Sequence, residues 1–205
     1  MKTIAQKQAD FVSMLRRKIC RQHTESLFLY YASPVIRKVK PAVLITVKSE
    51  CREMWKNRKK AMCKASGLHL AELRSKNDSS LFLIYDRNEL DKAIRNKWSL
   101  NIFKRYGYRT SGNIDEFIER LSNRFSSSDF PHEVGLFLGY PPSDVKAYIE
   151  NEGKNSACCR YWKVYGNVEK AQETWARIDE AQSLAIDILQ NFPPIHIAAN
   201  LLKAV

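Results

Sequence analysis

Residues 68–86 read LHLAELRSKNDSSLFLIYD, and this stretch constrains the fold more than any other part of the sequence. Apolar and polar residues alternate over its first half, and its second half is apolar throughout. The polar segment from Lys76 to Ser79 separates the two halves. Two β-rich runs joined by a short polar turn are typical of a β-hairpin, whose strands pair antiparallel. We therefore expect an antiparallel strand pair in the middle of the chain.

A second pattern predicts parallel strands. The apolar run VGLFLGY (134–140) is predicted as a strand, PSDVKAYIE (142–150) as a helix and RYWKVYG (160–166) as the next strand. A strand, a helix and a strand in this order require a parallel, right-handed crossover. PAVLITVK (41–48) predicts one more buried strand. Together these patterns predict an α/β fold with a mixed sheet of about five strands, parallel in part and with one antiparallel hairpin, packed with helices.

Helical periodicity and capping residues predict the remaining elements. The helices are expected at 3–32, before Pro34; at 49–65, with Ser49 as N-cap and Gly67 at the end; at 88–106; at 113–125, capped by Asn113; and from Asn167 to about residue 190. With 205 residues the chain is long enough to bury a core as one domain. We divide this domain into a basic helical segment (1–32), an α/β core (33–180) and a helical tail (181–205).

The positive charge is concentrated in the first third of the chain. The formal net charge is +12, and residues 1–60 carry 15 Lys and Arg against 4 Asp and Glu. Such an excess suits phosphate, nucleic acid or an acidic partner. A patch would form if Lys56, Lys59 and Lys60 lay beside Arg16, Arg17 and Lys18. Five consecutive polar residues on a helix span about 500°, however, so we favour a scattered arrangement. Nucleic-acid binding by this third of the chain is the alternative.

The sequence also predicts the compartment. Its start contains no uninterrupted apolar segment typical of a signal peptide, and no apolar run has the length of a bilayer span. Five dispersed cysteines in such a chain predict free thiols. We therefore expect a cytoplasmic protein without a membrane partner. No pattern in the sequence identifies a cofactor or an oligomeric state.

Two blocks of the sequence resemble an uncharacterised bacterial family, a domain of unknown function. The specific block runs through FPHEVGLFLGYPPSDVKAYIE, GKNSACCRYWKVYG and NVEKAQETWARI, and the looser one is SPVIRKVKPAVLITV. Ala32 stands where the family pattern has a cysteine, which argues against a thiol site at that position. The resemblance implies a small cytoplasmic protein with a contextual link to iron or redox physiology in anaerobes, and it implies no mechanism.

A ligand site is predicted at the carboxyl edge of the parallel strands, where open α/β sheets bind ligands. Three strand-to-helix junctions are expected to meet there, each with a helix N-terminus that favours an anion. Their residues are Lys48, Ser49, Tyr140, Ser143, Tyr165 and Asn167. A binding or regulatory protein for a small anionic ligand is the leading hypothesis, with ordinary helix capping as the competing interpretation. The sequence contains neither a G-x-G-x-x-G nor a Walker loop.

A different chemistry is predicted at the opposite edge of the same strands. His132 and Glu133 precede one predicted strand, and Cys158 and Cys159 precede the next. A cysteine near a histidine suits a nucleophile with its base, or two ligands of a metal. A thiol-dependent enzyme or redox protein is therefore the alternative function, with a buried structural cysteine as the competing interpretation. Elsewhere Cys20 and His23 have the spacing of neighbours on a helix, but no second pair of ligands completes a metal site with them, so no metal is predicted. Whether the protein is an enzyme stays open.

Overall fold

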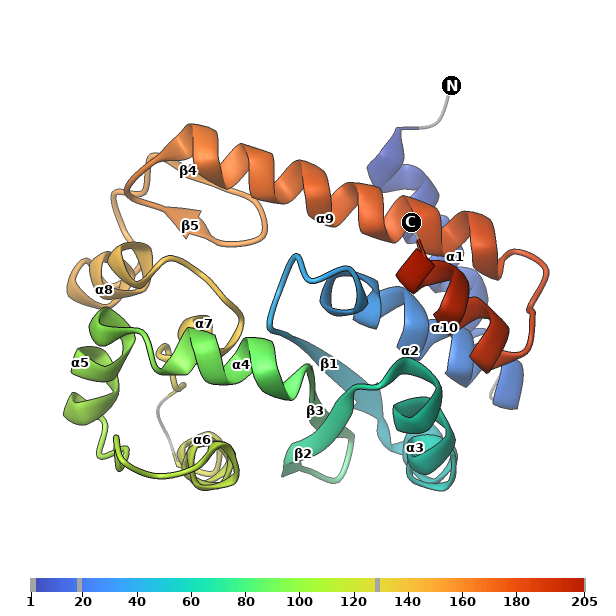
Figure 1. Cartoon of the computed structure of the whole chain (residues 1–205), viewed down its shortest axis with the longest axis horizontal. Helices are drawn as coiled ribbons and strands as arrows, with labels where there is room; N and C mark the ends of the chain where they lie inside the picture. The colour runs from blue at the N-terminus through green and yellow to red at the C-terminus, as the bar shows by residue number, and fades with distance from the viewer. Residues whose placement is uncertain (1–2, 18–19, 128–129, 205) are drawn as a thin grey trace.

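A three-stranded antiparallel sheet organises the protein (Figure 1). The computed structural model describes residues 3–17, 20–127 and 130–204. The strands are β1 (Ala42–Lys48), β2 (His69–Ser75) and β3 (Ser79–Tyr85), in the order β1-β3-β2. The predicted hairpin is confirmed, because β2 and β3 pair antiparallel. β3 also pairs antiparallel with β1, and it is the central strand.

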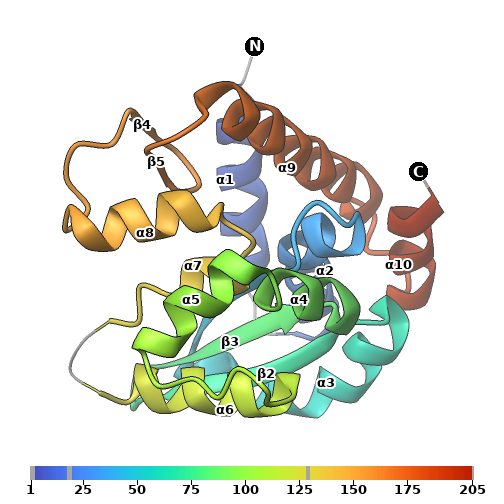
Figure 2. The ribbon, with the colours of Figure 1, turned by 60° about the vertical axis from the view of Figure 1, so that its left-hand side comes forward.

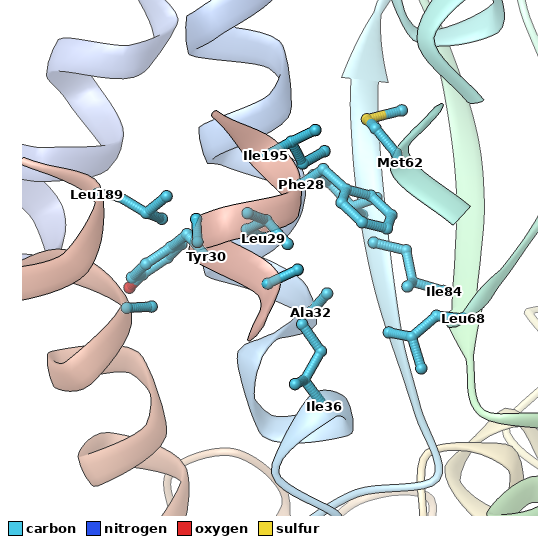
Figure 3. Packing of buried hydrophobic residues seen from close by; sticks show 14 of the residues in the cluster. Phe28, Leu29, Tyr30, Ala32, Ile36, Met62, Leu68, Ile84, Leu189 and Ile195 are labelled. Carbon is cyan, nitrogen blue, oxygen red and sulfur yellow. The ribbon is translucent and has the colours of Figure 1, made fainter. Parts of the chain in front are cut away.

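Helices cover both faces of this sheet. Six of the seven residues of β3 are buried, so neither of its faces is left to solvent. Side chains at alternate positions enter different cores: Phe82 and Ile84 belong to one, and Leu81 and Leu83 to the other. The first core contains side chains of α2 (Arg21–Ile36), α3 (Arg52–Ser66) and α10 (Ile195–Ala204), and Figure 3 shows some of them with Ile84 of β3. The second is filled by α4 (Arg87–Ile94), α5 (Lys97–Arg105), α6 (Ile114–Phe125) and α7 (Val134–Phe137), seen in Figure 2.

The predicted first helix is two helices. α1 (Ile4–Arg16) begins at Thr3 with a capping box, and α2 begins after Cys20 and continues through Pro34. A proline inside a helix removes one backbone N–H and leaves a carbonyl without its donor. Here the hydroxyl of Ser33 donates to the carbonyl oxygen of Tyr30 at 2.8 Å. This bond supplies the missing donor, which is why the expected end before Pro34 was wrong.

Capping residues mark several helix boundaries as predicted. Asn113 caps α6, Asn167 caps α9 (Val168–Leu189), and Gly67 ends α3 with a φ of +76°. Ser49 is not a cap, because a short 3-10 turn (Ser49–Cys51) precedes α3 and Cys51 occupies the N-cap position. The predicted helix at 88–106 is also two helices, α4 and α5, and Asn96 caps the second.

The predicted parallel strands are wrong. Residues 134–140 contain the short helix α7 and a turn, and 160–166 contain the two-residue strand β5 (Lys163–Val164), which pairs antiparallel with β4 (Cys158–Cys159). The described residues form no parallel pair and no five-stranded sheet, and 61% of them are helical and 13% are in strands. The apolar run misled the prediction because a fully buried helical turn and a fully buried strand have the same composition.

A third, smaller core joins the second half of the chain to the rest. The β4-β5 hairpin packs on the first half of α9 through Trp162, Val164 and Trp175, and α8 (Pro142–Glu150) lies below the hairpin in both views (Figures 1 and 2). The second half of α9 contributes Leu189 to the first core. At 22 residues α9 is about 33 Å long, so it spans from one core to the other.

Candidate functional site

The candidate site is built around the rings of Tyr140 and Trp162, which stack with 5.0 Å between their centroids. Tyr140 lies at the turn between α7 and α8, and Gly139 before it has a φ of +76°. A Cβ atom at Gly139 would lie 2.5 Å from Cδ of Pro41. Only glycine therefore allows this turn to approach the segment before β1 so closely. The turn holds Tyr140 against the beginning of the central sheet.

Lys40 lies over the ring of Tyr140, with its Nζ 5.0 Å from the ring centroid. Burial lowers the pKa of Lys40 from 10.5 to about 8. Within the described part of the chain its ammonium has no ion pair and no hydrogen bond, so the ring of Tyr140 is the group that stabilises its charge. The Tyr140 hydroxyl donates to the carbonyl oxygen of Tyr161 at 3.0 Å, and burial raises the pKa of Tyr140 to about 12.

Asp144 fixes the geometry on the other side of Trp162. Its carboxylate is 3% exposed and accepts three hydrogen bonds, from Nε1 of Trp162 at 2.9 Å and from the backbone N–H groups of Tyr165 and Gly166 at 3.0 and 2.9 Å. These bonds connect α8 to the loop between β5 and α9. A buried carboxylate with three donors is a structural group, and it positions the start of α9 beside the start of α8.

A polar cavity of about 480 Å³ opens where three helices begin. It is walled by the Tyr140–Trp162 pair, by the end of α4 and by the first turns of α5, α8 and α9. Its polar and charged lining side chains include Lys92, Asn96, Ser99, Ser143, Asn167 and Lys170. We call this space the polar cavity. Two of the residues predicted from strand-to-helix junctions, Ser143 and Asn167, are thus brought together with Tyr140.

The helix starts give the polar cavity a positive electrostatic character. The side chains of Asn96 and Asn167 cap α5 and α9 by accepting from the N–H groups of Trp98 at 2.9 Å and Lys170 at 2.8 Å. The first turn of α8 begins with Pro142 and carries no side-chain cap. The first turns of helices expose backbone N–H groups and the positive ends of their dipoles, which favour an anion.

Two lysines add full charges to the wall of the polar cavity. Lys92 forms an exposed ion pair with Glu89 at 2.9 Å, three residues earlier on α4. The ammonium of Lys170 has neither an ion pair nor a hydrogen bond within the described ranges. An exposed ion pair contributes little to stability, so Lys92 can exchange Glu89 for a bound anion at small cost. The cavity therefore offers two cations.

An aromatic cavity of about 250 Å³ lies on the other side of the Tyr140–Trp162 pair, which lines both spaces together with Asp144. Its ring-bearing lining residues are Phe130, His132, Tyr140, Tyr148, Tyr161 and Trp162. The rings of His132 and Tyr148 lie 5.1 Å apart. Cys159 and Arg160 from the β4-β5 hairpin line the same space. The structure thus places His132 and Cys159 in one cavity, although the parallel strand pair that predicted this meeting does not form among the described residues.

Glu133 faces away from that cavity. It is 0% exposed, and its Oε1 accepts from Nε of Arg124 at 2.9 Å and from the hydroxyl of Tyr108 at 3.2 Å, while its buried Oε2 has no partner among the described residues. Burial, and then the nearby charge of Glu133, raises the pKa of Tyr108. The adjacent residues His132 and Glu133 therefore do not act as a pair, and Glu133 joins α7 to α6.

The other predicted site residues lie elsewhere. Lys48 and Ser49 are at the far end of β1 from Ala42, about 20 Å along the strand, where the N–H of Ser49 donates to Asp78. Cys158 packs against the third core, and Tyr165 follows β5 without lining either cavity. Cys20, Cys63, Cys158 and Cys159 are free thiols in the described part of the chain. The strand-edge geometry behind the prediction is absent, yet part of the residue set meets in the polar cavity through helix starts.

Sequence reasoning missed several residues of the polar cavity, among them Lys92, Asn96 and Lys170. The first two were placed inside one continuous helix at 88–106, where an asparagine has no special role. Asn96 was nevertheless a usable signal, because asparagine is among the best N-cap residues and two shorter helices satisfy the same periodicity. No pattern in the sequence indicated Lys170, because its position in the cavity wall depends on which helix N-termini pack together.

Only some of the basic residues in the first third of the chain can be placed in the described part of the structure. All four lysines of α3 are exposed, and they are Lys56, Lys59, Lys60 and Lys64. Arg58, which lies among them, is partly buried and its Nε donates to Glu25 at 2.8 Å. Lys18 and the side chain of Arg16 lie outside the described residues. The scattered arrangement therefore stays a prediction, with the patch formed by the two helices as its alternative.

Two absences hold for residues 3–17, 20–127 and 130–204. These residues contain no group of three or more His, Cys, Asp or Glu side chains that is placed to bind a metal ion. None of their helices combines the length and the apolar composition that a membrane crossing requires.

Comparison with known proteins identifies the family and no activity. No curated protein and no solved structure matches the chain. One family model, described as a protein of unknown function (DUF3793), matches residues 28–196, which include both cavities. The chain therefore belongs to the DUF3793 family, as its resemblance to a domain of unknown function predicted.

Proposed function

We propose that the protein binds a small anionic ligand in the polar cavity and acts as a binding or regulatory protein. The observation that carries this proposal is the convergence of the first turns of α5, α8 and α9 on one cavity whose wall includes Lys92 and Lys170. Oriented backbone N–H groups and ammonium groups are the donors that recognise phosphate, sulfate and carboxylate. The strand edge predicted from the sequence is replaced by this helix-start geometry.

The sharpest test changes the charge of the cavity without removing a helix cap. Asn167→Asp keeps an excellent capping oxygen for α9 and adds a negative charge to the cavity wall. We expect the variant to fold normally and to lose affinity for pyrophosphate about tenfold or more, because like charges in contact cost several kcal/mol. Isothermal titration calorimetry with pyrophosphate, phosphate and sulfate measures the affinity.

Asn113→Asp is the matched control. Asn113 caps α6 through the same kind of bond, to the N–H of Glu116 at 3.0 Å, and it does not line the polar cavity. This control variant should bind pyrophosphate like the parent protein. The proposal fails if the parent protein binds none of the three anions, or if both aspartate variants weaken binding equally.

A thiol-dependent activity is the second candidate function. The observation that favours it is the position of His132 and Cys159 in the wall of one cavity. Arg160 lines this cavity too, and its Nη2 forms an ion pair with Asp179 at 2.8 Å. A neighbouring imidazole activates a thiol as a nucleophile by accepting its proton.

Thiol reactivity near pH 7 tests this candidate. We expect Cys159 to react with iodoacetamide faster than free cysteine, and His132→Ala to remove the difference. Cys158→Ser is the control, since Cys158 packs against the third core. Equal rates for Cys159 and free cysteine would eliminate the thiol function and leave the anion-binding proposal intact.

We also propose a cytoplasmic location and, as an alternative function, nucleic-acid binding. The free thiols of Cys20, Cys63, Cys158 and Cys159 in the described part of the chain fit the reducing cytoplasm that the sequence predicts. Nucleic-acid binding by the first third requires the exposed lysines of α3 to act with residues of α1. A gel-shift titration at two salt concentrations tests it, because binding to phosphates weakens steeply with salt.

A further inference from the structure

A groove with an exposed tryptophan lies next to the polar cavity. It has a volume of about 490 Å³ between α5 and α8, and its lining includes Trp98, Asn101, Arg105 and Lys146. The side chain of Trp98 is 70% exposed, which makes it the most exposed of the large apolar residues identified among the described residues. We call this space the tryptophan groove.

The tryptophan groove adjoins the polar cavity at the start of α8. Pro142 and Ser143, the first two residues of α8, line both spaces. On α5, Asn96 and Ser99 line the polar cavity while Trp98 lines the groove, so residues within one helical turn, about 5.4 Å along the axis, line the two spaces. The two spaces therefore lie close enough for one ligand to contact both.

The chemistry of the groove selects a flat ring with polar edges. An indole face attracts planar π-systems. The amide of Asn101 and the guanidinium of Arg105 both line the groove, and they need hydrogen-bond partners when a ligand displaces water. An aliphatic chain would leave these two groups without partners. A heterocycle with nitrogen and carbonyl groups on its edge would satisfy them.

Charge in the groove also agrees with an anionic ligand. Lys146 forms an exposed and long ion pair with Glu150 at 3.8 Å, which a ligand can replace at little cost. The only acidic residue that lines either the groove or the polar cavity within the described ranges is Asp144, whose carboxylate already accepts three hydrogen bonds. A negatively charged ligand that contacts both spaces therefore meets two cations in each, Lys92 and Lys170 in the polar cavity and Arg105 and Lys146 in the groove.

We propose that the anionic ligand is a nucleotide, with its phosphate in the polar cavity and its base stacked on Trp98 in the tryptophan groove. This inference rests on the proposed function, because the phosphate occupies the cavity that the anion-binding proposal assigns. It adds the class of the ligand and a recognition residue for its base.

Binding of AMP and of ribose 5-phosphate separates the two proposals. These ligands carry the same sugar phosphate, and only AMP has a base. We expect AMP to bind at least about tenfold more tightly, because stacking of a base on an aromatic side chain contributes that much. Trp98→Ala should remove this difference and leave the affinity for ribose 5-phosphate unchanged, while Trp98→Phe should retain most of it.

An exposed aromatic residue elsewhere supplies the control. Phe130 is 55% exposed and lines the aromatic cavity, so Phe130→Ala should leave AMP binding unchanged. Equal affinities for AMP and ribose 5-phosphate, or an AMP preference that survives in Trp98→Ala, would overturn the nucleotide inference and leave anion binding standing. Failure of AMP, ribose 5-phosphate and pyrophosphate to bind would overturn both proposals.

Discussion

Replacing Lys40 with methionine should stabilise the protein, and the gain should depend on pH. Lys40 is held over Tyr140, and burial lowers its pKa from 10.5 to about 8. At neutral pH the folded protein therefore keeps a charge in a place that disfavours it. Methionine keeps an unbranched side chain of similar length and carries no charge, so Lys40→Met removes this cost.

The size of the effect follows from the pKa difference between the unfolded and folded chains. The difference between 10.5 and about 8 corresponds to about 3 kcal/mol, at about 1.4 kcal/mol for each pKa unit. Between these two pH values the unfolded chain binds the proton and the folded chain does not. The free energy of unfolding of the parent protein therefore rises with pH across this window. The cost is complete below about pH 8 and disappears above about pH 10.5.

Urea unfolding at two pH values measures the effect. Lys40→Met should raise the free energy of unfolding by about 3 kcal/mol near pH 7 and by only about 1 kcal/mol near pH 9.5. Lys38→Met is the control, because the side chain of Lys38 is 55% exposed and pairs with Asp86, so its loss should bring no gain. A gain from Lys40→Met that is the same at both pH values, or no gain near pH 7, would refute the reasoning.

Three further predictions concern the residues that hold the site together. Gly139→Ala should destabilise the protein more than Gly67→Ala, whose cost should be about 1 kcal/mol, because both glycines have a φ of +76° but only a Cβ at Gly139 meets a neighbour at 2.5 Å. Equal losses of unfolding free energy in urea would contradict this prediction. Asp144→Ala should lower the free energy of unfolding by about 3 kcal/mol and weaken pyrophosphate binding, because three hydrogen-bond donors lose their acceptor. An unchanged unfolding free energy and an unchanged affinity in calorimetry would show that the carboxylate does not position the two helices. Glu133→Gln should lower the free energy of unfolding by about 3 kcal/mol, because it leaves the partly buried Arg124 without its ion pair. A loss below about 1 kcal/mol in urea unfolding would contradict this role of the ion pair.

The central part of the fold was predictable because its causes are local in the sequence. The alternation and the polar turn in residues 68–86 define a hairpin wherever they lie, and both strands formed as expected. Asn113, Asn167 and Gly67 mark helix boundaries through bonds and backbone angles that involve only neighbouring residues. The family could also be predicted, because it rests on residues alone.

The errors arose where composition allows two structures. The run from Val134 to Leu138 is buried throughout, and burial on every side removes the alternation that distinguishes a strand from a helical turn. The contact between Gly139 and Pro41, which lie far apart in the sequence, accompanies a turn at this place and not an extended strand. Once this segment is helical, the parallel crossover and its strand edge disappear.

The candidate site was likewise predictable from the sequence only in part. The residue types at the helix starts, Ser143 and Asn167, were visible in the sequence because capping is a local property. Their meeting with Lys92, Asn96 and Lys170 was not, since it depends on how α4, α5, α8 and α9 pack around the Tyr140–Trp162 pair. The sequence determined which segments end in groups that favour an anion. Only the tertiary structure decided which of those groups face one cavity, because long-range packing sets the positions of the helices relative to one another.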